Sequence, residues 1–234
     1  MIDMHSHILY GIDDGSRTRE ESIELLKFLE KQGVTESIVT PHYIDDTQFV
    51  ASIEKKKELI RDLQKETNIK LYIGNEVYFS DKTIESLNSK KLSTLNDSKY
   101  ILIEFPLSNR IKDVDEMVYD LSTNGVIPII AHPERYLYVQ EDYKYLDKLV
   151  EIGALFQVNY GSIIGTYGSK VEKTAKTLLK KGYISFLGSD IHRIDKPIDL
   201  EKAMKKLKKI VKKQEIVDDL TYNNIKKIIN NESL

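Results

Sequence analysis

The chain opens with Met1-Ile2-Asp3-Met4-His5-Ser6-His7-Ile8-Leu9, in which two histidines, two residues apart, follow a short strand-like stretch. Side chains at i and i+2 of an extended strand point to the same side, so His5 and His7 can bind one cation together. Asp3 is placed to be the carboxylate that orients a ligating imidazole. An isolated His-x-His pair is more often incidental than a metal site, so its meaning depends on what the rest of the chain brings to the same place.

Short apolar runs alternate with longer amphipathic segments along the whole chain, which predicts repeated strand–helix units and a mainly parallel sheet. No linker rich in proline, glycine or serine divides the sequence, so we expect residues 1–234 to form a single domain. Seven such units predict an α/β fold with a barrel of about seven strands, and a doubly wound open sheet is the alternative. The predicted strands are Met1–His5, Ser37–Thr40, Lys70–Gly74, Tyr100–Phe105, Ile127–Ala131, Ala154–Asn159 and Ile184–Gly188.

The first predicted helix has a clear start signal. Ile23, Leu26 and Leu29 share one helical face, and Thr18 with Glu21 forms a candidate capping box just before them.

Composition excludes several classes of protein. The net charge of −2 gives no overall field that would attract nucleic acid or an anionic membrane. The absence of cysteine rules out disulfides, thiolate nucleophiles and cysteine-bound zinc. The first residues lack the basic and apolar regions of a signal peptide, and no apolar run reaches the ~18 residues of a membrane-spanning helix. We therefore expect a cytoplasmic protein with no nucleic-acid partner and no stable membrane insertion.

The five histidines and three acidic residues share one position in the repeated pattern, because each lies at or just after the end of a predicted strand. In a β/α barrel the carboxyl ends of all strands meet at one face, so residues far apart in the sequence converge there. Each one alone has an ordinary explanation, such as a turn, an ion pair at the barrel mouth or a helix cap. Together they predict a metal cluster, and imidazole with carboxylate suits Mn, Fe or Zn. The residues are His5, His7, His42, Glu76, Glu104, His132, Asp190 and His192.

The predicted ligands lie in short motifs that resemble those of the PHP (polymerase and histidinol phosphatase) superfamily, in family order and over essentially the whole chain. More narrowly, the sequence resembles the bacterial capsule-locus protein-tyrosine phosphatases of the CpsB/YwqE kind, which act on autophosphorylated tyrosine kinases that control capsule or extracellular polysaccharide export. The motifs are Asp3-x-His5-x-His7, Ile12-Asp13-Asp14-Gly15, Thr40-Pro41-His42, Gly74-x-Glu76, Glu104-Phe105-Pro106, His132-Pro133-Glu134-Arg135 and Ser189-Asp190-x-His192.

The resemblance implies a distorted TIM-like β/α barrel and two or three divalent metal ions, with Mn favoured over Fe or Zn. Asp14 enters only through the resemblance, because Asp13-Asp14-Gly15 by itself reads as a turn. The implied ligands are His5, His7, Glu76 and Asp190 for the first metal, Glu76, Glu104 and His132 for the second, and Asp14, His42 and His192 for the third.

The substrate-binding and catalytic groups are less well defined. Arg135 offers a planar two-pronged donor that matches phosphate, or else forms a salt bridge to an acid at the barrel mouth. Asp190 and His192 could assist the leaving group. An arginine commonly follows the last metal motif in this family; here Arg193 is close to the motif and Lys196 lies nearer the usual place.

Three functions are compatible with these residues. The first is a metal-dependent protein-tyrosine phosphatase acting on an autophosphorylated bacterial kinase. The second is a small-molecule phosphatase of the same fold, such as one acting on histidinol phosphate. The third is a non-catalytic PHP scaffold, which is disfavoured because such a domain should have lost metal ligands.

Overall fold

All seven predicted strands form, and every strand pairing is parallel. The computed structural model describes residues 1–110, 112 and 114–234. The strands are shorter than predicted at several ends: β1 (Ile2–Asp3), β2 (Glu36–Val39), β4 (Lys70–Ile73), β6 (Tyr100–Glu104), β7 (Ile127–Ala131), β8 (Leu155–Asn159) and β9 (Phe186–Gly188).

Two further strands, β3 (His42–Tyr43) and β5 (Glu76–Tyr78), were not predicted. They continue β2 and β4 after interruptions at residues 40–41 and 74–75. Pro41 lacks a backbone N–H, so it cannot continue the hydrogen-bonded ladder. At Gly74 an added Cβ would lie 3.0 Å from Leu95 Cδ2, so the chain passes there without room for a side chain.

The interruptions divide the curled sheet into two parts. One has the order β1-β2-β4, and the other has the order β3-β5-β6-β7-β8-β9. The last strand meets the first again through a parallel bridge between Ser6 and Ile191, and the Asp190 N–H donates to the His5 carbonyl at 2.7 Å. The predicted distorted β/α barrel is therefore confirmed.

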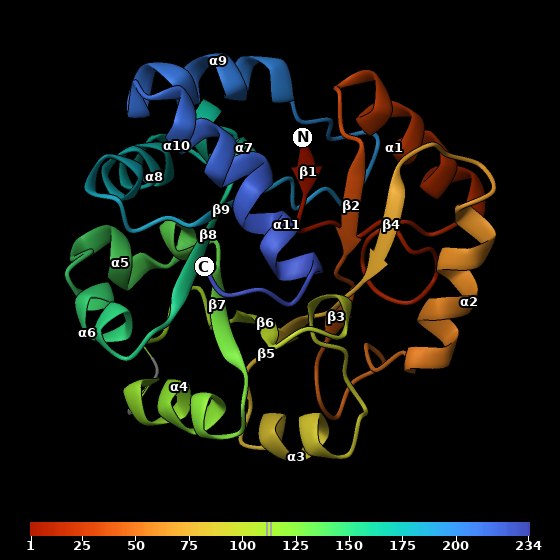
Figure 1. Ribbon diagram of the computed structural model, residues 1–234, viewed down its shortest axis with the longest axis horizontal. Helices are drawn as coiled ribbons and strands as arrows, with labels where there is room; N and C mark the ends of the chain where they lie inside the picture. Colours follow the sequence, from red (N-terminus) through yellow and green to blue (C-terminus); the bar gives the residue numbers. More distant parts are fainter. Residues whose placement is uncertain (111, 113) are drawn as a thin grey trace.

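The helices surround this barrel, with α11 lying across the ring of strands in Figure 1. Ile225, Ile228 and Ile229 of α11 pack in one core cluster with inward-facing strand residues such as Ile2 and Phe186. The Asn224 side chain donates to the Ser185 carbonyl, just before β9, at 3.0 Å. Thus α11 closes the amino end of the barrel and leaves the carboxyl end open.

The remaining helices pack on the outside, where their apolar faces and the outward-facing strand residues form the larger core. Among the described residues, no helix is both long and apolar enough to cross a membrane. The α-helices are α1 (Arg19–Lys31), α2 (Ile53–Leu63), α3 (Thr83–Asn88), α4 (Val114–Thr123), α5 (Leu137–Glu141), α6 (Tyr145–Glu151), α7 (Tyr160–Ile164), α8 (Ser169–Lys181), α9 (Leu200–Val211), α10 (Gln214–Asp218) and α11 (Asn224–Ile229). Short 3₁₀ turns cover Leu95–Asp97 and Pro133–Arg135, and a π turn covers Asp219–Asn223.

The predicted capping box at the start of α1 is only half formed. The Thr18 hydroxyl accepts from the Glu21 N–H at 3.2 Å, as expected. The Glu21 carboxylate, however, accepts from the Arg17 N–H at 2.7 Å rather than from the Thr18 N–H.

Candidate metal centre

The nine residues predicted as ligands come together at the carboxyl end of the barrel. His5 and His7 follow β1, His42 and Glu76 begin β3 and β5, and Glu104 ends β6. His132 follows β7, Asp190 and His192 follow β9, and Asp14 lies in the loop before α1. Residues from strand ends along almost the whole chain thus lie together in one cluster.

The first predicted set forms a tight, buried group. His5, His7, Glu76 and Asp190 each offer one ligand atom, and these four atoms all lie within 4.8 Å of one another. His5 Nε2 is 3.1 Å from Glu76 Oε2 and 3.4 Å from Asp190 Oδ1, and His7 Nε2 is 3.2 Å from the same Glu76 oxygen.

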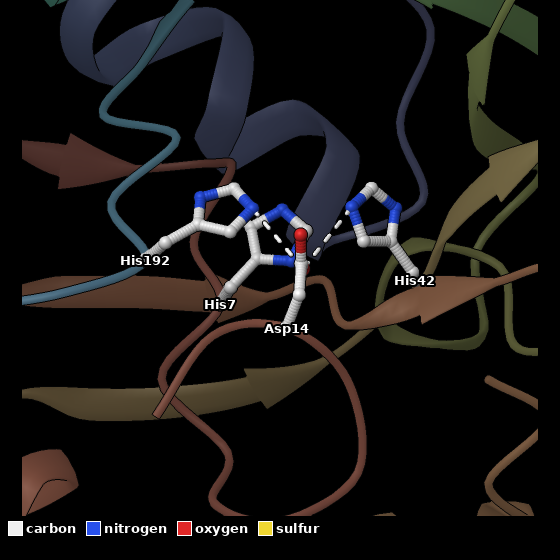
Figure 2. A group of neighbouring side chains, drawn as sticks. All are labelled: His7, Asp14, His42 and His192. Atoms are coloured by element: carbon white, nitrogen blue, oxygen red, sulfur yellow. Dashed lines mark ion pairs between the residues drawn. The ribbon is translucent and has the colours of Figure 1, made fainter. Parts of the chain in front are cut away.

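A second group gathers around Asp14 and is more open. Asp14 Oδ1 is 3.5 Å from His42 Nε2 and 3.4 Å from His192 Nε2, and Figure 2 shows the three side chains facing one another beside His7. His7 belongs to this group as well as to the first. The Asp14 side chain is 56% exposed, so the cluster can be reached from solvent on this side.

The predicted set for the second metal also lies together. His132 Nε2 is 2.9 Å from Glu76 Oε1 and 3.6 Å from Glu104 Oε1. His42, Glu76 and Glu104 form a further group of ligand atoms within 4.8 Å of one another. Glu76 therefore stands between the groups, which is the position a bridging carboxylate needs.

The charges of this cluster fit metal binding. Burial opposes protonation of His5, but the Glu76 and Asp190 carboxylates outweigh it and raise the pKa of His5 to about 9. Burial also opposes ionisation of Glu76, yet the His5 and His42 imidazoles hold the pKa of that carboxyl well below its usual range. Burial and repulsion by Glu76 raise the pKa of Glu104 to about 7.

Protons on His5 and His7, whose pKa values are both raised, thus balance the crowded carboxylates, and divalent cations can take the place of those protons. The geometry supports the same reading, because His5 Nε2 and His7 Nε2 face each other at only 3.1 Å. The buried Nδ1 atom of His132 has no hydrogen-bond partner among the described residues. The imidazole and carboxylate donors present therefore fit a cluster of divalent transition-metal ions.

The groups that orient the imidazoles differ from the prediction. Among the described residues, Asp3 makes no hydrogen bond to an imidazole: its carboxylate accepts from the Ser189 N–H at 2.7 Å and the Ser189 hydroxyl at 2.6 Å, so it ties β1 to the loop after β9. The His7 ring instead donates from Nδ1 to Asp13 Oδ2 at 2.8 Å. The His5 ring donates from Nδ1 to Gln157 Oε1 at 3.0 Å.

Asp13 and Gln157 were not identified from the sequence. Gln157 and Asn159 are polar residues two apart in an otherwise apolar strand, and that spacing is a signal for an inward-facing polar pair. Asn159 donates to Asp190 Oδ2 at 2.7 Å and accepts from the Gln157 amide at 2.8 Å. Gln157 and Asn159 therefore hold His5 and Asp190 of the cluster in place from the barrel interior.

Arg135 reaches the same mouth from the turn after β7. Its guanidinium donates to Asp190 Oδ2 at 2.9 Å and lies over the Tyr167 ring, 4.9 Å from the ring centroid. His132 adopts a left-handed conformation with φ 33°, which turns the chain sharply before Pro133. The salt bridge to a mouth acid is therefore present, and within the part of the chain that the structure describes the guanidinium makes no other hydrogen bond.

Arg193 and Lys196 are placed less favourably for binding phosphate. Arg193 lies between two carboxylates outside the cluster, at 3.3 Å from Asp195 and 3.5 Å from Glu21. Lys196 is exposed in the same loop, and no ion pair among the described residues links it to the cluster.

Comparisons with known proteins agree with this architecture. Tyrosine-protein phosphatase YwqE of Bacillus subtilis is 36% identical over 199 residues, which cover 83% of this chain and 78% of YwqE. Tyrosine-protein phosphatase CpsB of Streptococcus pneumoniae is 34% identical over 205 residues, which cover 83% of this chain and 84% of CpsB. These similarities bear out the predicted resemblance to the CpsB/YwqE kind.

Solved structures show the same relationship. A crystal structure from the work on YwqE and CpsB, described as unique metal-dependent tyrosine phosphatases, matches with a TM-score of 0.90 and 32% identity, covering 100% of this chain and 96% of its own. Histidinol phosphate phosphatase from Lactococcus lactis shares the fold alone, with a TM-score of 0.58 and 14% identity over 90% of this chain and 92% of its own.

The family model described as capsular polysaccharide synthesis, CpsB/CapC, matches residues 1–230. With the fold, the cluster and these relatives in agreement, the chain belongs to the CpsB/CapC family of capsular polysaccharide synthesis proteins.

Proposed function

We propose that this chain is a metal-dependent protein-tyrosine phosphatase that acts on an autophosphorylated bacterial tyrosine kinase of capsular or extracellular polysaccharide synthesis. The observation that carries the proposal is the convergence of five histidines and four carboxylates at one open barrel end, with Arg135 beside them. The named relatives are tyrosine-protein phosphatases, which supports the same substrate class.

The residues would hold two or three divalent ions, with Mn favoured over Fe or Zn. The first set is His5, His7, Glu76 and Asp190, and Glu76 is shared with Glu104 and His132. Asp14, His42 and His192 form the third set, with His7 close enough to join it. When bound, such ions lower the pKa of a coordinated water and neutralise phosphoryl oxygens.

The protein's own groups bind and orient the substrate. Arg135, held by Asp190 on one side and the Tyr167 ring on the other, presents to the phosphoryl oxygens the N–H groups that have no hydrogen-bond partner among the described residues. A phenoxide leaving group has a parent pKa of about 10, so it needs little protonation to depart. We assign Asp190 and His192, which share the loop after β9, to assist that departure. We propose that Arg193 and Lys196 make secondary contacts to a bound peptide.

The open side of the cluster suits a phosphotyrosine presented on a polypeptide. Asp14 and His192 keep 56% and 28% of their side chains exposed, so a protein segment can approach them.

The proposed substrate is a kinase that phosphorylates itself with ATP, and we therefore propose that the reaction takes place in the cytoplasm. We further propose that residues 1–234 act as one catalytic domain that has no nucleic-acid partner and does not insert stably into a membrane.

The test compares kcat/KM for a phosphotyrosyl peptide, a phosphoseryl peptide and histidinol phosphate. The proposal predicts clear preference for the phosphotyrosyl peptide in the Mn²⁺-loaded protein. Glu76→Gln should abolish most of this activity, whereas Glu85→Gln, an exposed change on α3, should not. Faster turnover of histidinol phosphate would instead support the small-molecule phosphatase.

A further inference from the structure

A buried lysine lies behind the metal centre. The first half of α2 contains Lys55, Lys56 and Lys57, and the outer two have side chains that are 47% exposed. Lys56 is completely buried, on the same helical face as Leu59 and Leu63. Its amino group donates to the Ser93 hydroxyl at 2.8 Å and to the Asn75 side-chain oxygen.

This placement is unfavourable for stability alone. Among the described residues no ion pair involves Lys56, and both of its hydrogen-bond acceptors are neutral. Burial lowers the pKa of Lys56 to about 7. An apolar side chain of similar length, such as methionine, would avoid the desolvation that a buried amino group suffers. Packing alone therefore does not explain a lysine at this position.

The partner of Lys56 connects the two strand interruptions. Asn75 lies between β4 and β5, and its side-chain amide donates to the Pro41 carbonyl, between β2 and β3, at 2.8 Å. Its side-chain oxygen also accepts from the Ser93 N–H at 2.8 Å. The Asn75 side chain thus bridges both breaks in the sheet and is held from behind by Lys56.

Directly after these breaks come two residues of the metal cluster. His42 and Glu76 are register partners in the β3–β5 pair, one residue beyond Pro41 and Asn75. Each takes part in two of the three groups of candidate ligands. A small shift of either break would therefore move ligands of more than one ion.

We infer that Lys56 is a positioning residue for the metal centre: it fixes Asn75 against Pro41, and so sets where His42 and Glu76 enter the cluster. The inference rests on the proposed metal centre. Among the described residues, the Lys56 amino group makes hydrogen bonds to Asn75 and Ser93 and to none of the nine candidate ligands.

The test compares Lys56→Met with the matched exposed change Lys57→Met on the same helix. Melting temperature is measured on the metal-free protein, and Mn²⁺ affinity is measured by titration calorimetry. Lys56→Met should melt at an unchanged or higher temperature and yet bind Mn²⁺ on the order of tenfold more weakly, the loss typical of groups that orient metal ligands. Lys57→Met should match the wild type in both.

Lys56→Gln provides a second variant, because its neutral amide can still donate towards Asn75; it should recover part of the affinity. A Lys56→Met protein with wild-type Mn²⁺ affinity would overturn the inference and leave the proposed function intact. A lower melting temperature with unchanged affinity would overturn it too, since Lys56 would then be only structural. Failure of the wild type to bind Mn²⁺ would overturn the proposed metal centre and this inference with it.

Discussion

Arg135 at the barrel mouth has two possible roles, binding the phosphate during catalysis or only stabilising the fold, and one mutation distinguishes them. Its guanidinium lies between the buried Asp190 carboxylate, at 2.9 Å, and the Tyr167 ring. In Arg135→Ala both contacts are lost together with every N–H group that could meet a phosphoryl oxygen. The two accounts predict different losses from this single change.

The loss of stability should be small. Asp190 keeps its hydrogen bond from Asn159 at 2.7 Å and its neighbour His5 at 3.4 Å, so it is not left without partners. The missing charge-assisted bond then lowers the free energy of unfolding by about 1–2 kcal/mol. For a chain of this size that corresponds to a fall of a few degrees in melting temperature.

The loss of activity should be larger. A preorganised donor to developing negative charge contributes about 3 kcal/mol to transition-state stabilisation, so kcat/KM should fall on the order of a hundredfold. Arg135→Lys keeps the charge but loses the planar fork, and it should be impaired as well.

The assay measures kcat/KM on a phosphotyrosyl peptide, melting temperature and Mn²⁺ content for each variant. Arg110→Ala is the matched control, because Arg110 also lies over a tyrosine ring, at 4.3 Å from the Tyr145 centroid, but outside the cluster. A marked fall in the melting temperature of Arg135→Ala with nearly intact turnover would refute the assignment of Arg135 to the phosphate.

Three further outcomes are expected. Asp13→Asn replaces the carboxylate that accepts from His7 Nδ1 with a neutral amide, so Mn²⁺ affinity should fall about 10- to 100-fold in titration calorimetry; unchanged affinity would contradict this. Folded His7→Ala protein should lose most turnover and bind less metal in elemental analysis, and near-normal activity would refute its assignment as a ligand. Because His5 has a raised pKa of about 9, its proton competes with metal below that value, so Mn²⁺ affinity should rise from pH 7 to 9 with proton release; a flat profile would count against ligation by His5.

The repeated pattern of apolar runs was sufficient to predict the barrel and its seven main strands. It could not reveal β3 and β5, because strands of two and three residues are too short to show a period. The breaks before them arise from Pro41 and from the crowded passage at Gly74, and they depend on neighbours distant in the sequence.

The convergence of eight of the nine ligands followed from their shared place at the strand ends, whereas Asp14 was expected only from the family resemblance. The groups that orient the ligands could not be predicted. Asp3 and Asp13 are both close to the histidines in sequence, and only the folded loop decides which carboxylate faces an imidazole. The loop returns so closely over His7 that a Cβ at Gly15 would collide with the His7 carbonyl oxygen. That close return brings Asp13 to the His7 ring.

Lys56 illustrates a different limit. Three successive lysines in a helix predict a solvated surface, and nothing local distinguishes the middle one. Its burial becomes visible only when α2 is packed against the break at Asn75.

If this cluster hydrolyses phosphotyrosine with bound metal, hydrolysis must depend on the metal. The decisive measurement is phosphate release from a phosphotyrosyl peptide by one preparation as purified, after chelation and after Mn²⁺ is restored. We expect chelation to abolish hydrolysis and Mn²⁺ to restore it, with two or three ions bound per chain. Undiminished hydrolysis by protein shown to be metal-free would contradict it.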